Sequence, residues 1–335
     1  MGHPIYHLET KIEHCSVRIR LNDLTVVTLA TTGDQPEWFA PPLNPYLVGE
    51  ENMLEIDVTP IPNQDGSPGD FSKVVVEGAV RRYEKGEPVA PGSGPVALEL
   101  AVMAELPQRL EDARDRGEEP EIPQVFYFVF DNEGPDFSQE LGEADPYADE
   151  AALRDYAIRL RDLMRARDAS ALATEMQPKV QAYAAAYDDD AGRIGESLRE
   201  VLQAHYVPRG LETEFERDDV ELVACCGGRL WELRRPGGLP LMQTPADADG
   251  GTMQIPILVA PRDGTLRVVR GRIRSGPIGS EGCAECSRSR PRPADRRSRS
   301  PTCARCPRLP RRRSRSRSPT SPCSSRPTAA PARRR

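Results

Sequence analysis

Histidine is scarce in this chain, with four among 335 residues. Acid–base catalysis would therefore have to rest on carboxylates, which are too abundant here for any one pair to stand out. The nucleophile elbow G-x-S-x-G, the Walker phosphate loop, the H-E-x-x-H motif and the Rossmann fingerprint are all absent. We therefore expect a protein that is not an enzyme, and keep catalysis in a pocket of the second half as an alternative.

Long apolar runs are also missing. No stretch approaches 18 apolar residues, so we expect no membrane span. The opening MGHPIYHLETKIEHC has neither a basic start nor an apolar core, so we expect no secretory signal. His3 and His7 are four residues apart, but Pro4 lies between them, and we expect a frayed terminus rather than a metal site. The expected location is the cytoplasm.

Cysteine and charge are distributed unevenly. Residues 1–280 contain three cysteines, too few for a disulfide framework, and residues 281–335 contain five. The last 55 residues hold 17 Arg, no Lys and three acids, a net charge of +14, so the whole-chain value of −7 leaves −21 for residues 1–280. Phosphate binding needs clustered Lys and Arg, so nucleic acid is expected to bind only through the tail, if that segment is genuine.

The first part of the chain has the alternation of antiparallel strands. Residues 15–30, CSVRIRLNDLTVVTLA, read as two strands joined by an Asn22-Asp23 turn, and further strands are expected at Leu54–Val58, Lys73–Tyr83 and Val125–Asp131. The last of these is apolar on both faces, so we expect a central strand. The VRIRLND strand followed by PYLVGEENMLEIDV resembles galactose-binding-like jelly-roll domains over residues 15–75. That resemblance implies a β-sandwich and, as an alternative function, carbohydrate binding.

In the second part of the chain, the spacing of apolar residues changes from that of strands to that of helices. After an acidic linker at 133–148, apolar residues recur at helical spacing from Leu153 to Met164, with Asp149 as the expected amino-terminal cap. A second helix should start near Ser170 and be delayed or kinked by Pro178, and a third should run from Ile194 to Tyr206. Glycine-rich turns then separate several short strands. Helices followed by an antiparallel sheet, opening with LRDYAIRLRDLMRARDASAL, resemble NTF2-like α+β domains over residues 149–274.

The tail contains the clearest spacing motif. Cys283, Cys286, Cys303 and Cys306 form C-x2-C-x16-C-x2-C, a spacing found in zinc sites. The intervening residues include no large aliphatic or aromatic side chain and many arginines, which argues against a folded zinc site. The run RRRSRSRSPTSP resembles the Arg-Ser domains of splicing factors, which implies RNA contacts. The Arg, Ser, Pro, Cys and Ala composition is also what a GC-rich gene gives when it is read out of frame, and we favour that interpretation.

These observations predict an α+β multidomain chain. The expected parts are a β-sandwich at 1–132, the acidic linker at 133–148, the NTF2-like domain at 149–274 and a disordered basic tail at 275–335. The expected function is non-catalytic binding of a protein partner or a small apolar ligand, without a cofactor unless the tail binds zinc. The predicted ligand-binding residues of the second domain are Trp231, Leu233, Met242, Ile255, Ile257 and His205, although the five apolar side chains would equally serve as core.

Overall fold

The computed structural model describes residues 2–31, 36–63, 67, 69–212, 214–248, 250–271 and 274–277. It is a mixed α+β structure with several antiparallel sheets. By its contacts the chain divides into two units, Met1–Arg290 and Pro291–Arg335, and the second lies wholly outside the described residues. Among the described residues, no helix combines the length and the apolar character that crossing a membrane requires.

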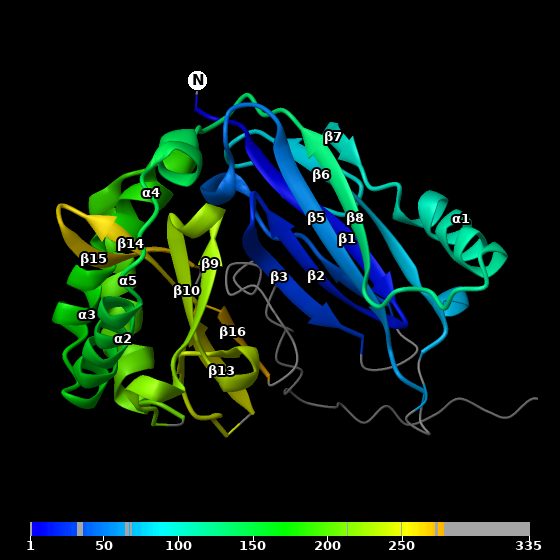
Figure 1. The fold of residues 1–335 in the computed structure, drawn as a ribbon. Coiled ribbons are helices and arrows are strands. Elements are labelled where there is room, and N and C mark those ends of the chain that lie inside the picture. The colour runs from blue at the N-terminus through cyan, green and yellow to red at the C-terminus, as the bar shows by residue number, and fades with distance from the viewer. Residues whose placement is uncertain are drawn as a thin grey trace, which may run out of the picture. The chain divides into compact units, whose positions relative to one another are not determined.

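Two four-stranded antiparallel sheets form the amino-terminal half, in the orders β4-β1-β6-β7 and β3-β2-β5-β8 (Figure 1). Their inward side chains share one core. The elements are β1 Ile5–Glu13, β2 Cys15–Leu21, β3 Leu24–Ala30, β4 Glu37–Phe39, β5 Asn52–Pro60, β6 Val75–Tyr83, β7 Val96–Glu99, α1 Val102–Asp115 and β8 Gln124–Phe130.

Local sequence explains two of these strand pairings. Asn22 and Asp23 both have positive φ, as the tight hairpin between β2 and β3 requires. Gly78 of β6 faces Thr10 of β1, and a Cβ at this position would lie 2.2 Å from the carbonyl oxygen of Glu9. Only glycine therefore lets β1 and β6 approach this closely.

Three expectations for this half are wrong. Ile5–Glu13 is not a frayed terminus but strand β1, in which Leu8 and Ile12 are completely buried. Strand β8 is not central but lies at the edge of its sheet, with Tyr127 and Val129 exposed. A 14-residue helix, α1, lies where only strands and turns were expected, and it packs Val102 and Leu106 into the core.

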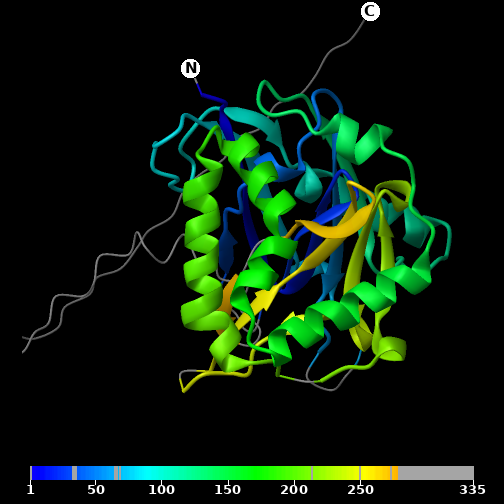
Figure 2. The same ribbon diagram turned by 90° about the vertical axis from the view of Figure 1, so that its left-hand side faces the viewer.

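The second half follows the expected order of helices and then strands. Figure 2 shows the green helices in front of the yellow strands, and the buried side chains of both form a second core. The elements are η3 Gln139–Glu143, α2 Glu150–Arg165, α3 Ala169–Glu175, α4 Gln177–Tyr187, α5 Ala191–Val201, η4 Leu202–Tyr206, β9 Glu221–Cys225, β10 Leu230–Arg235, β11 Leu239–Pro240, β12 Met242–Gln243, β13 Gly251–Ile255, β14 Ile257–Arg262, β15 Thr265–Arg270 and β16 Arg274–Pro277.

Two signals from the sequence are confirmed here. The Asp149 carboxylate accepts a hydrogen bond from the backbone N–H of Ala152 and caps α2. Pro178 separates the expected second helix into α3 and α4, which meet at Met176. Strand β16 pairs with β13 as far as Pro277.

Buried residues join the two halves. The first core contains Leu230, Leu258 and Val269 of the second half beside the sandwich residues. Asn44, which is completely buried, donates through Nδ2 to the carbonyl oxygen of Ala186, 2.9 Å away. Whether residues 1–132 and 149–274 fold independently stays a prediction.

Candidate functional site

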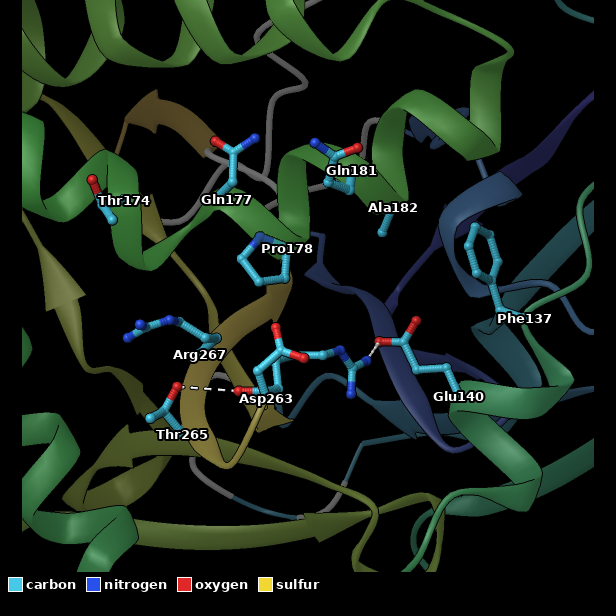
Figure 3. A pocket seen from close by; sticks show the side chains of 11 residues that line it. Phe137, Glu140, Thr174, Gln177, Pro178, Gln181, Ala182, Asp263, Thr265 and Arg267 are labelled. Atoms are coloured by element: carbon cyan, nitrogen blue, oxygen red, sulfur yellow. Dashed lines mark hydrogen bonds and ion pairs between the residues drawn. The ribbon is translucent and has the colours of Figure 1, made fainter.

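A pocket of about 670 Å³ lies between the α3–α4 junction, the β14–β15 hairpin and η3 (Figure 3). It is open to solvent on one side. Its floor comes from the hairpin turn, and its walls come from the helices and from the segment around η3. The lining residues are Phe137, Glu140, Thr174, Gln177, Pro178, Gln181, Ala182, Arg262, Asp263, Thr265 and Arg267.

Arg267 is anchored beside the pocket by a buried carboxylate. Its Nη1 donates to Glu175, 2.8 Å away, and only 2% of Glu175 is exposed. Tyr156 Oη and Arg159 also donate to Glu175, at 2.9 Å and 2.6 Å. Burial and the neighbouring Glu175 carboxylate raise the pKa of Tyr156, so its phenol stays a donor. Three donors on one buried carboxylate hold the Arg267 side chain in place.

The opposite wall rests on Glu140, which pairs with both Arg262 and Arg270. Arg270 is completely buried. Its Nε donates to the carbonyl oxygen of Pro45 at 2.8 Å, and its guanidinium carbon lies 4.6 Å from the ring centre of Phe137. These contacts fix η3 against both the hairpin and the amino-terminal half.

Three polar side chains of the pocket point to solvent instead. Gln177, Gln181 and Asp263 are exposed, and within the described part of the chain none of them has a side-chain hydrogen bond. Asp263 occupies the turn of the β14–β15 hairpin with positive φ, and it is exposed. The amides can donate and accept, and the carboxylate can accept.

Glu140 of the pocket and Glu175 beside it are suited to positioning rather than to proton transfer. Glu140 is held by two guanidinium groups and Glu175 by two guanidinium groups and a phenol. A general base needs access to the reacting proton, whereas both oxygens of each of these carboxylates already accept hydrogen bonds from protein donors.

The apolar residues predicted to bind a ligand lie elsewhere. Leu233, Met242, Ile255 and Ile257 are buried in the second core, and Trp231 packs against it and donates through Nε1 to the carbonyl oxygen of Tyr147. Their burial accounts for their apolar character without a ligand, and a ligand-binding role stays a prediction. His205 is exposed on η4 and does not line the pocket.

The structure describes the cysteines of the body of the protein but not those of the predicted zinc site. The zinc hypothesis falls outside the described residues, because Cys283, Cys286, Cys303 and Cys306 all lie beyond Pro277. Cys225 and Cys226 are buried free thiols, and burial raises the pKa of each to about 12. Such thiols are protonated and unreactive at neutral pH, as expected for packing residues. The described residues contain no group of three or more His, Cys, Asp or Glu side chains able to hold a metal ion.

Sequence reasoning missed the pocket, although two of its signals were present. The sequence predicts the break at Pro178, and Asp263-Gly264 is one of the glycine-rich turns expected between the short strands. What the sequence could not show is that these two turns lie against each other and against η3, which is more than 30 residues from either in the chain. Comparisons with protein-family models, with curated proteins and with solved structures find no match to this chain.

Proposed function

We propose that this protein is a non-catalytic binding protein whose pocket takes a small, uncharged ligand bearing hydroxyl or amide groups. The supporting observation is the balance of positive and negative charge among the residues that line the pocket. Glu140 and Asp263 oppose Arg262 and Arg267, so the formal charges cancel, and the groups left without partners are two amides and one carboxylate. An anionic ligand would meet the unpaired Asp263 carboxylate, and an apolar ligand would leave these groups unpaired.

Neutral sugars and their charged derivatives provide the direct test. We expect glucose-type mono- and disaccharides to shift ligand-detected NMR signals with the full-length protein, and the matching sugar phosphates and uronic acids to bind at least tenfold more weakly. Asp263→Ala and Gln181→Ala should each weaken binding about tenfold, because each removes one or two hydrogen bonds worth about 1 kcal/mol apiece. Asp115→Asn and Gln203→Ala, on α1 and η4 away from the pocket, are the matched controls and should change nothing.

Other outcomes would redirect the proposal. Neutral-sugar binding that is indifferent to Asp263→Ala would move the site to the amino-terminal sandwich, the carbohydrate-binding alternative. Binding of charged sugars alone would refute an uncharged ligand. Absence of binding to every compound, including short neutral peptides, would refute the pocket as a ligand site and favour a protein partner.

The finer fold assignments belong to this proposal as well. Two face-to-face antiparallel sheets support a jelly-roll-like first half, and four helices preceding antiparallel strands support an NTF2-like second half. A cytoplasmic location belongs to the proposal too, and the described cysteines support it, because Cys15, Cys225 and Cys226 are free thiols.

A further inference from the structure

Strand β8 carries an apolar surface at the edge of its sheet. It pairs with β5 on one side, and no described strand pairs with its other side. Tyr127 and Val129 are more than half exposed, at 59% and 57%, and Met53 opposite Val129 on β5 is 47% exposed. An exposed, apolar edge strand of this kind is a template for pairing with another strand.

The hydrogen-bonding groups of β8 can be assigned from its neighbour. Both the N–H and the carbonyl of Met53 bond to Asn22, on the β2 side of β5. Because backbone groups alternate along an antiparallel strand, the residues of β5 on either side of Met53 must face β8, and they bond there to Phe126, Phe128 and Phe130. The N–H and carbonyl groups of Val125, Tyr127 and Val129 therefore point to the open edge. The carbonyl oxygen of Val125 does so directly, since it accepts from Arg109 of α1 at 2.6 Å.

Five of the seven residues of this strand read the same in both directions. Val125-Phe126-Tyr127-Phe128-Val129 is a palindrome centred on Tyr127. If two copies of β8 pair antiparallel about Tyr127, each Val125 faces the other copy's Val129, and the side chains on both faces match. The residues that would bond across the two-fold axis are those whose backbone groups point to the edge. We propose that this protein forms a symmetric dimer by pairing its two β8 strands in this register, which joins two four-stranded sheets into one.

Charge at this surface permits a second copy to approach. Residues 1–280 carry a net charge of −21, so two copies repel each other over most of their surface. Beside β8, however, the carboxylates of β5 are neutralised within the same chain, Asp57 by Arg18 and Glu55 by Arg20. The outer face of β5 beside β8 is therefore neutral, next to the apolar side chains of β8. A peptide or protein strand of strong charge would gain nothing here over a second copy.

The dimer should be weak. Pairing of two seven-residue strands buries less than the roughly 1,200–2,000 Å² of a stable interface, and Arg109 must give up its bond to Val125 for the full ladder to form. We expect a dissociation constant on the order of 10 μM.

Cysteine cross-linking tests the register directly, in the full-length chain with Cys283, Cys286, Cys303, Cys306 and Cys323 changed to Ser. In the proposed dimer the two Tyr127 Cα atoms lie about 5.5 Å apart, within the range of a disulfide, whereas the two Val129 Cα atoms lie about 14 Å apart. We expect Tyr127→Cys to form a covalent dimer under mild oxidation and Val129→Cys to remain monomeric. A mixture of Val125→Cys and Val129→Cys chains should form only the mixed dimer.

Sedimentation velocity of the cysteine-intact chain between 1 and 200 μM tests the association itself. The proposal predicts a concentration-dependent dimer that Tyr127→Lys weakens at least tenfold, because it places two like charges about 5.5 Å apart across the axis. Ala30→Lys, an exposed position on β3 at the opposite edge of the same sheet, adds the same charge and should have no effect. A monomer at every concentration, open-ended aggregates, or cross-linking of Val129→Cys as fast as Tyr127→Cys would overturn the proposal. None of these outcomes depends on the ligand of the pocket.

Discussion

Arg270 shows how single residues bind the two halves of this structure together. It is fully buried, yet its guanidinium group is shared among the carbonyl oxygen of Pro45, the carboxylate of Glu140 and the ring of Phe137. The nearby Arg262 pairs with the same Glu140 but remains partly exposed. Glu140 therefore pairs with one buried arginine and one solvated arginine. Comparing the two separates the effect of burial on stability from the effect of charge.

Replacing Arg270 should cost far more stability than replacing Arg262. We expect Arg270→Met to lower the free energy of unfolding by about 3 kcal/mol, because a buried carbonyl and part of a carboxylate lose their partner. Arg262→Met, the matched control, should cost less than about 1 kcal/mol, since water can replace an exposed arginine. Urea unfolding measures both, and equal losses would mean that burial of Arg270 contributes nothing.

The buried thiols make stability depend on alkaline pH. Burial raises the pKa of Cys15, Cys225 and Cys226 to about 12 each, whereas an unfolded cysteine ionises near pH 8.5. Their contribution to stability is complete below pH 8.5 and declines as the pH rises toward 12, because the unfolded chain loses protons that the folded chain keeps. The limit is about 1.4 kcal/mol per pH unit for each thiol. Between pH 9 and pH 10, Cys15→Ala should make the decline in urea-measured stability less steep than in the unsubstituted protein, which has the same tyrosines, and an unchanged slope would contradict this assignment.

Secondary structure shows which elements the sequence could specify. The helix α2 was predicted with its cap because both signals are local, an aspartate at the start and apolar residues at a spacing of three and four. Strand β8 was misplaced because the Phe residues that face the core and the Tyr and Val residues that face solvent are all apolar. Alternation cannot be read where both faces are apolar, so an exposed edge strand was mistaken for a central one.

The contribution of the α2 cap to stability can be tested by substitution. Asp149→Ala should lower the free energy of unfolding by about 1 kcal/mol, because the N–H of Ala152 loses its acceptor. Asp149→Ser keeps an acceptor at the same position and should recover most of the loss. Chemical denaturation of both variants provides the comparison, and equal stability of the two would show that the carboxylate acts through its charge or not at all.

For the whole molecule, the described cores are complete before residue 270. The last buried residue of either core is Val269, and β16 then adds one edge strand that ends at Pro277. We expect a chain ending at residue 280 to unfold within about 1 kcal/mol of the full-length protein. A chain ending at Gly271 loses β16, leaves β13 unpaired on that side, and should be less stable by several kcal/mol. Calorimetry of the three chains distinguishes these cases, and a large loss on the first truncation would show that residues beyond 280 support the fold.

The sequence alone determined most elements and their order, because hydrophobic periodicity, helix caps and glycine turns act within a few residues of each other. It also determined the division of charge between an acidic body and a basic tail. Only the tertiary structure decided that β8 lies at an edge and that the Pro178 break, the Asp263 turn and Glu140 form one pocket. Those features depend on contacts between segments far apart in the chain, and no local pattern in the sequence records which distant segment a residue will meet.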